Sequence, residues 1–368
     1  MPITEVTHAG TTLRYGNDDI GCDSPDDVKT TLEKHGVAVL PSVLSTAECA
    51  AMNRGMWDTV EHLTSGLLQP VARGDPNTYN SVFELTPNHG GLFQHHSWGH
   101  AQYVWDVRQN HKVAKPFEAI YGATADDMLV SFDGINCSLG GITPGERRGV
   151  YRGGNWLHLD QRLSEPSFQC VQAWVSANAV LPGDATLRVL RGSHNHFGAL
   201  AEQFGMTDTK ADWFKTTPEQ QTWLKERGCD DLCVTCPAGS MVFWDSRTVH
   251  SGTEPVPAAS CPPRPDDAPR TARNVVYVCM QPRDTNAKRL ARNLAKRRDI
   301  LDPNTPQFLR LASHWPNKMK LFGRHPRSYG KGPPAGCVQS DPSQHWSFVP
   351  PMPAPALTAH GKHIAGLE

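Results

Sequence analysis

Hydrophobic residues recur at helical spacing in the first third of the chain. The segments Asp26–His35, Ser45–Leu63 and Trp105–Tyr121 place apolar residues on one face and polar residues on the other. In the second segment Ser45 is followed three residues later by Glu48, the pattern of a capping box. The sequence therefore predicts three helices, the second of which begins next to Ser45.

Short hydrophobic runs of a different kind dominate from residue 128 onward. They are rich in Val, Phe, Trp and Leu, and Gly, Pro or Asp residues border most of them, which is typical of β-strands. The predicted strands are Val37–Leu40, Met128–Asn136, Phe168–Ala177, Ala185–Leu190, Met241–Trp244 and Asn274–Met280. Together they predict a mainly β core with flanking helices, an α+β fold class.

Polar and proline-rich segments set the predicted domain limits. We expect an irregular arm at 1–24, a main domain at 25–283 and a C-terminal helical extension with a Pro-rich tail at 284–368 that packs on the same domain. A helical insertion is predicted at 200–228, where Pro218 begins a helix. The glycine- and histidine-rich stretch from Gly74 to His100 is predicted to be a solvated loop.

Composition and charge narrow the range of partners. The chain has 368 residues, of which 38% are hydrophobic, and 36 Lys and Arg against 37 Asp and Glu give a net charge of -1. A neutral protein has no overall positive field for nucleic acid or an anionic membrane. There is no run of about 18 apolar residues and no secretory signal pattern. We therefore expect a cytoplasmic protein with a small-molecule partner.

The 10 cysteines are scattered along the chain, as is typical of reduced thiols in a long intracellular protein. Cys229, Cys233 and Cys236 are spaced closely enough to suggest zinc. A fourth ligand at the usual spacing is missing, so the sequence favours reduced thiols near a strand.

The most informative residues are His158, Asp160 and His250. Residues two apart on a strand point to the same face, so His158 and Asp160 present an imidazole and a carboxylate together. His250 follows a glycine-led apolar strand that would deliver a second imidazole. Two histidines and one carboxylate suit non-haem Fe(II) and leave coordination positions open.

An arginine on a neighbouring strand suits an organic acid that would bind such an iron. Guanidinium groups bind carboxylates through two charge-assisted hydrogen bonds. Arg273 begins the predicted strand at 274–280, and Arg270 is the alternative three residues earlier.

Around these residues the sequence resembles the phytanoyl-CoA dioxygenase-like group of Fe(II)/2-oxoglutarate-dependent oxygenases. The similarity lies in five motifs spread over much of the chain. They are His35–Ser45, Trp156–Gln161, Gly183–Leu187, Gly192–His194, and Val249–Gly252 with the Arg273 strand.

The resemblance implies a double-stranded β-helix core of the jelly-roll or cupin-like type. It implies that His158, Asp160 and His250 hold Fe(II), that Arg273 binds the distal carboxylate of the co-substrate 2-oxoglutarate, and that Trp174 forms an aromatic wall beside it. The implied reaction consumes O2 and oxidises a C–H bond of a small molecule, usually by hydroxylation, with release of succinate and CO2.

The chain departs from the family pattern in two places. The proline-rich loop at 254–269 lengthens the gap between His250 and the arginine, which keeps Arg270 as the alternative to Arg273. The family's polar residue two positions after the distal histidine is replaced by glycine, so Ser251 or Thr253 is expected to substitute.

Three further residues are weaker candidates for the substrate side of the site: Asn155, Asn136 and His96. Two other functions remain open at this stage. One is a cupin-type metalloenzyme that does not use 2-oxoglutarate, and the other is a non-catalytic binding protein on the same fold.

Overall fold

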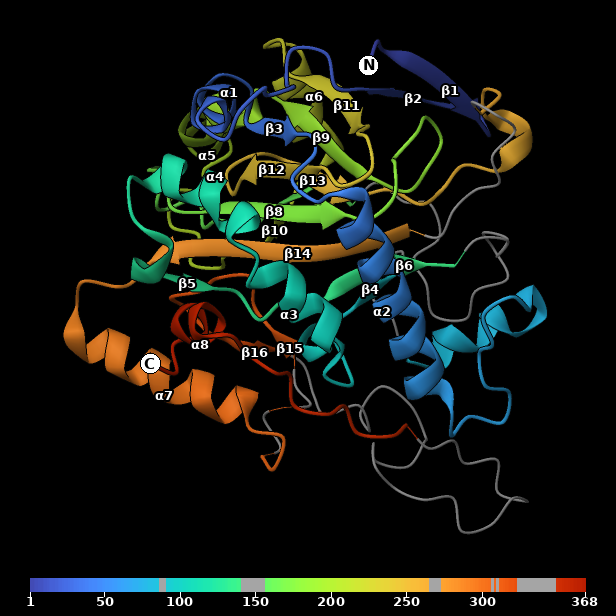
Figure 1. The fold of residues 1–368 in the computed structure, drawn as a ribbon. Helices are drawn as coiled ribbons and strands as arrows, with labels where there is room; N and C mark the ends of the chain where they lie inside the picture. The colour runs from blue at the N-terminus through green and yellow to red at the C-terminus, as the bar shows by residue number, and fades with distance from the viewer. Residues whose placement is uncertain (86–90, 140–155, 265–272, 306–307, 309–310, 323–348) are drawn as a thin grey trace. The chain divides into compact units, whose positions relative to one another are not determined.

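The chain folds into two compact units, each made of two chain segments. Unit 1 comprises Met1–Val43 and Arg152–Ala268, and unit 2 comprises Leu44–Tyr151 and Pro269–Glu368. The computed structural model (Figure 1) describes residues 1–85, 91–139, 156–264, 273–305, 308, 311–322 and 349–368. The predicted limits of the arm, the main domain and the extension stay predictions, and each unit is described by itself.

Unit 1 contains a seven-stranded sheet in the order β1-β2-β11-β9-β13-β7-β10. Its strands are β1 (Thr4–His8), β2 (Thr11–Gly16), β7 (His158–Leu159), β9 (Leu187–Arg191), β10 (Phe214–Lys215), β11 (Asp230–Val234) and β13 (His250–Gly252). The two short strands β7 and β13 pair with each other, and both carry residues of the predicted metal site.

A second group of strands in unit 1 has the order β3-β12-β8. They are β3 (Val37–Leu40), β8 (Val171–Ser176) and β12 (Met241–Asp245). All their residues are buried, which explains why they are continuous apolar runs rather than alternating ones. The helices of the unit are α1 (Asp27–His35), α5 (Phe197–Gln203) and α6 (Pro218–Lys225), with the 3-10 helices η4 (Ser193–His196) and η5 (Ala258–Ser260).

The prediction of an irregular arm at 1–24 is wrong for its first part. Residues 4–16 form the β1–β2 hairpin, and β2 also pairs with β11 in parallel. Ala9 and Gly10 both have positive φ values, of 47° and 77°, as a two-residue hairpin turn requires. The alternation is hard to see in the sequence because most residues of β1 and β2 are polar, and only a few, such as Val6 and Tyr15, are buried.

Unit 2 is built around the long strand β14 (Arg273–Pro282). β6 (Ile135–Ser138) and β5 (Met128–Val130) pair with different parts of β14, and β4 (Leu92–Phe93) pairs with β6. Figure 1 shows the helices α2, α3 and α4 packed along β14. The other elements are α2 (Thr46–Thr64), α3 (Gln102–Arg108), α4 (His111–Tyr121), α7 (Ala287–Leu301), α8 (Ala359–Ala365), η1 (Pro76–Leu85), η2 (Trp98–His100), η3 (Ala125–Asp127), β15 (Leu311–Ala312) and β16 (Leu321–Phe322).

The observed helices confirm most of those predicted from the spacing of hydrophobic residues. The capping box at the start of α2 is present, because the Ser45 hydroxyl accepts from the Glu48 N–H and the Glu48 carboxylate accepts from the Ser45 N–H. The helix predicted at 105–121 is instead two helices. Asn110 is the N-cap of α4 and its side chain accepts from the Lys112 N–H, which starts a new helix at that point.

Three further predictions need correction. The strand predicted at 128–136 is two strands, β5 and β6, that pair with different parts of β14. The histidine-rich run is not solvated, because residues 95–101 are all buried. The Pro-rich tail after Val349, in which the sequence predicts no regular structure, includes the helix α8, which Thr358 caps by accepting from the Gly361 N–H. The strand-rich, helix-flanked architecture nevertheless confirms the predicted fold class, a jelly-roll-like core whose sheets are not closed.

Candidate metal centre

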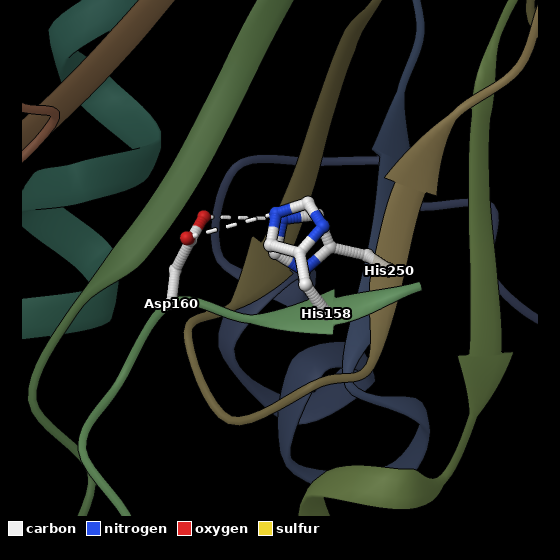
Figure 2. A group of neighbouring side chains, drawn as sticks. All are labelled: His158, Asp160 and His250. Atoms are coloured by element: carbon white, nitrogen blue, oxygen red, sulfur yellow. Dashed lines mark ion pairs between the residues drawn. The ribbon is translucent and has the colours of Figure 1, made fainter. Parts of the chain in front are cut away.

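Two neighbouring strands and the residue after one of them bring the predicted metal ligands together. His158 begins β7, Asp160 follows that strand directly, and His250 begins β13 opposite His158. One ligand atom from each residue lies within 4.8 Å of the others, and all three residues are buried. Figure 2 shows the Asp160 carboxylate facing both imidazole rings.

The Asp160 carboxylate lies close to both rings. Its Oδ1 lies 3.6 Å from His158 Nε2, and its Oδ2 lies 3.2 Å from His250 Nε2. The two imidazole centroids are 4.4 Å apart. Both histidines therefore turn the same nitrogen, Nε2, toward the carboxylate.

The other nitrogen of each ring fixes this orientation. His158 Nδ1 lies 3.1 Å from the Trp156 carbonyl oxygen, and His250 Nδ1 lies 2.9 Å from the Thr248 carbonyl oxygen. A carbonyl only accepts, so Nδ1 carries the proton and donates. The Nε2 lone pair is then left pointing at the centre, the tautomer that a metal-binding histidine uses.

A buried glutamine orients the carboxylate. Gln172 Nε2, on β8, donates to Asp160 Oδ2 at 2.9 Å. A hydrogen bond from a neighbouring side chain is a common support for a metal-ligating carboxylate. Gln172 was not among the predicted site residues, because only the folding of β8 brings it to Asp160.

Burial lowers the pKa of the His158 imidazole. The nearby His250 lowers it as well, whereas the Asp160 carboxylate opposes the shift. The neutral ring is the form that binds a metal. Burial of His158 thus favours the neutral ring that can bind a metal.

Aromatic side chains surround the two imidazoles. The Trp156 ring stacks on His158, with centroids 4.7 Å apart and planes at 19°. Trp244 lies 5.4 Å from His250, and Trp213 lies 5.8 Å from His158. None of these tryptophans was among the predicted site residues. Trp156 could have been predicted from strand alternation, since it precedes His158 by two residues and therefore projects to the same face.

Trp174 lies on the strand face that the site requires. It is buried on β8, two residues after Gln172, so the two side chains share one face of the strand. Since Gln172 contacts Asp160, that face is the one toward the metal ligands. The role of Trp174 as an aromatic wall beside 2-oxoglutarate stays a prediction.

The two hydroxyl residues expected to replace the family's polar position are not brought to the centre. Strand alternation turns Ser251 away from the face that carries His250. The Thr253 hydroxyl accepts from the Thr186 N–H at 3.0 Å. The position between them is Gly252, where an added Cβ would meet Trp156 at 3.6 Å. An aromatic ring therefore lies beside the position where the polar side chain was expected.

Unit 2 places the predicted arginine in a cluster of its own. Arg273, at the start of β14, donates from Nε to Asn136 Oδ1 at 2.9 Å. Burial raises the pKa of the Tyr277 phenol, which hydrogen bonds to both side chains. Asn136 therefore contacts Arg273, and its predicted place on the substrate side stays a prediction. His96 is buried in the same unit, and Asn155 and Arg270 lie outside the described residues.

The donor set fits ferrous iron. Two imidazole nitrogens and a carboxylate oxygen converge from three separate backbone positions, and this combination with open positions is typical of non-haem Fe(II) enzymes. The clustered cysteines offer no comparable centre within the described part of the chain. Burial raises the pKa of Cys229 to about 11 and that of Cys233 to about 12, so both thiols stay protonated.

Comparison with known families agrees with this geometry. The family model of phytanoyl-CoA dioxygenase (PhyH) matches residues 32–255, which is more than half of the chain. The chain belongs to the phytanoyl-CoA dioxygenase family. Membership confirms the predicted resemblance and, at the level of the family, the predicted class of Fe(II)/2-oxoglutarate-dependent oxidoreductase with its cofactors.

Individual relatives of this phytanoyl-CoA dioxygenase family member are distant. Ava biosynthesis cluster protein O from Aspergillus versicolor is 27% identical over 216 residues. That match covers 57% of this chain and 63%, less than two thirds, of the relative.

Two solved structures share the fold. Hypothetical protein JW0805 from Escherichia coli is 14% identical with a TM-score of 0.51, over 96% of this chain and 85% of that chain. The putative oxidoreductase from Salmonella typhimurium LT2 is 14% identical with a TM-score of 0.51, over 93% of this chain and 82% of that chain. In the described part of this family member, no helix is long and apolar enough to cross a membrane.

Proposed function

We propose that this protein oxidises a C–H bond of a small molecule, in the first instance by hydroxylation, while 2-oxoglutarate and O2 are converted to succinate and CO2. His158, Asp160 and His250 hold the Fe(II). Arg273 binds the distal carboxylate of 2-oxoglutarate, and Trp174 lines the site beside it.

The observation that carries this proposal is the convergence of the three ligand atoms within 4.8 Å. The supporting hydrogen bonds distinguish this cluster from a chance grouping of polar side chains. Backbone carbonyls fix both rings with Nε2 toward the centre, and Gln172 fixes the carboxylate. Three ligands held in this way are a preformed site, which an accidental cluster of polar residues would not be.

The protein's own residues have separate tasks in this reaction. The two imidazoles and Asp160 leave part of the coordination sphere open for co-substrate and dioxygen, and iron bound there supplies the oxidising power for a strong C–H bond. The rings of Trp156 and Trp244 cover the imidazoles and keep bulk water from them.

The Arg273 cluster supports a role in binding an acid. Asn136 and Tyr277 hold the guanidinium in one orientation, and a fixed planar guanidinium is suited to a carboxylate. The relative from Aspergillus versicolor is named as a biosynthesis cluster protein, which supports a small-molecule substrate.

The deciding experiment is an anaerobic titration of the apoprotein with Fe(II) and then 2-oxoglutarate. We expect the visible charge-transfer band of the iron–2-oxoacid chelate in the wild type and its loss in His158→Ala. His196→Ala is the matched control, since this histidine belongs to the same unit but contacts Trp223 instead of the centre. A folded, iron-loaded wild type without the band would refute the assignment. A band justifies a substrate screen by succinate release.

A further inference from the structure

Trp213 is a large apolar side chain that remains in water beside the metal centre. It is 51% exposed, and its ring lies 5.8 Å from the His158 ring. Neighbouring aromatic residues of the same insertion, Phe214 and Trp223, pack on a hydrophobic cluster that includes Leu159. Among the described residues Trp213 is not part of that cluster, so core packing does not account for its position.

The register of β10 explains why the Trp213 ring points where it does. Phe214 pairs with Leu159, and Lys215 pairs with His158. Paired residues project to the same face, so Phe214 joins Leu159 in the hydrophobic cluster. Trp213, one residue before, projects to the other face, which carries His158 and Asp160.

The backbone around Trp213 is held on both sides. Before it, the Asp212 carboxylate accepts from Arg162 Nε at 2.9 Å, which ties it to the segment just after the metal ligands. After it, the Thr216 N–H donates to the Leu157 carbonyl oxygen at 2.9 Å. The exposed ring is therefore presented by a fixed segment and is not part of a loosely held loop. Tryptophan is enriched among the residues that contribute most to binding, and aromatic side chains commonly line ligand sites.

We propose that Trp213 binds the substrate by stacking against a flat, apolar ring of it and so presents the ring to the metal centre. This inference rests on the proposed function and names its substrate class, a compound with a planar, hydrophobic ring system. The indole of Trp213 supplies a flat face at low entropic cost, and the stacked Trp156 adds aromatic surface on His158.

The test uses 2-naphthol as a flat bicyclic probe and 2-decalol as its saturated, non-planar counterpart. Each is titrated calorimetrically into protein loaded with Mn(II) and 2-oxoglutarate, and into metal-free protein. We expect saturable binding of 2-naphthol to the wild type, with a Kd roughly tenfold higher in Trp213→Ala. Trp213→Phe retains a flat ring and should stay within about threefold of the wild type.

Trp223→Ala is the matched control. It removes the same side chain from the same insertion, but that ring packs against Arg227, whose guanidinium carbon lies 3.7 Å from the ring centroid. We expect 2-naphthol binding to be unchanged in this variant. For 2-decalol, which cannot stack, the loss in Trp213→Ala should be much smaller than for 2-naphthol.

Two results would overturn the inference: no saturable 2-naphthol binding to the wild type, or an equal Kd in Trp213→Ala. Binding of Mn(II) and 2-oxoglutarate is measured first, so that failure of the proposed function can be distinguished from failure of the proposed role of Trp213. Failure of these ligands to bind refutes the proposed function, whereas normal binding of both with no effect of Trp213→Ala refutes only the role of Trp213. The metal-free titration reports on Trp213 in either case.

Discussion

Gln172→Leu is the sharpest test of how the metal centre is supported. The glutamine is 5% exposed and donates to Asp160 Oδ2 at 2.9 Å. Leucine nearly conserves its volume but leaves one carboxylate oxygen without this donor. A hydrogen bond to a charged group contributes about 1.5–3 kcal/mol, which corresponds to a Kd for metal roughly 10–100-fold higher.

The assay is calorimetric Mn(II) binding, with circular dichroism to show that the variant is folded. Gln221→Leu is the matched control, because this buried glutamine donates to Thr216 Oγ1 at 3.0 Å and not to a metal ligand. The control should lose stability but keep its Kd within about twofold. A Gln172→Leu protein that binds Mn(II) as tightly as the wild type would refute the argument that this hydrogen bond orients Asp160.

Three other predictions concern unit 2. Arg273→Ala should weaken 2-oxoglutarate binding roughly 100-fold and leave 2-oxopentanoate, which lacks the distal carboxylate, unaffected; an equal loss for both acids in calorimetry would contradict the assigned role. Burial lowers the pKa of His95 to about 4 and of His100 to about 3. In the unfolded chain both histidines have an ordinary pKa of about 6.5, so on acidification the unfolded chain binds protons at a higher pH than the folded protein. The free energy of unfolding should therefore fall as the pH drops below ~6.5, by about 2 kcal/mol per histidine at pH 5. Urea unfolding of His100→Asn should show a weaker pH dependence, and an unchanged one would oppose this reasoning. Ser45→Ala should cost about 1 kcal/mol in thermal unfolding, whereas Ser45→Thr keeps a hydroxyl that accepts from the Glu48 N–H and donates to the Glu48 carboxylate, and should keep most of the stability.

The convergence of His158, Asp160 and His250 was predictable in part from a local signal. His158 and Asp160 are two residues apart, so strand alternation places them on one face. The third residue, His250, joins them through the pairing of β13 with β7, and it was predicted from its position after a glycine-led apolar strand together with the resemblance to the family. The capping box of α2 was predictable from a local signal, since Ser45 and Glu48 contact each other across three residues.

Residues that depend on strand pairing were not predictable. Gln172 reaches Asp160 only because of the way β8 folds beside it, and nothing in the run Val171–Ser176 marks it as a site residue. Trp213 reaches His158 only because β10 pairs with β7. A two-residue strand inside a helical insertion carries too little periodicity to be recognised in the sequence.

Gly252 and Trp156 are in contact, and the pair bears on which kind of substrate the site accepts. The Trp156 Nε1 donates to the Gly252 carbonyl oxygen at 2.9 Å, and an added Cβ at position 252 would lie 3.6 Å from its ring. Where the family pattern has a polar side chain, this chain thus has a glycine next to an indole ring that stacks on His158. Since Trp213 adds a second indole near the same imidazole, this side of the centre is aromatic. Such a wall offers dispersion and stacking but few hydrogen bonds, so it selects for the flat, apolar part of a substrate rather than for its polar groups.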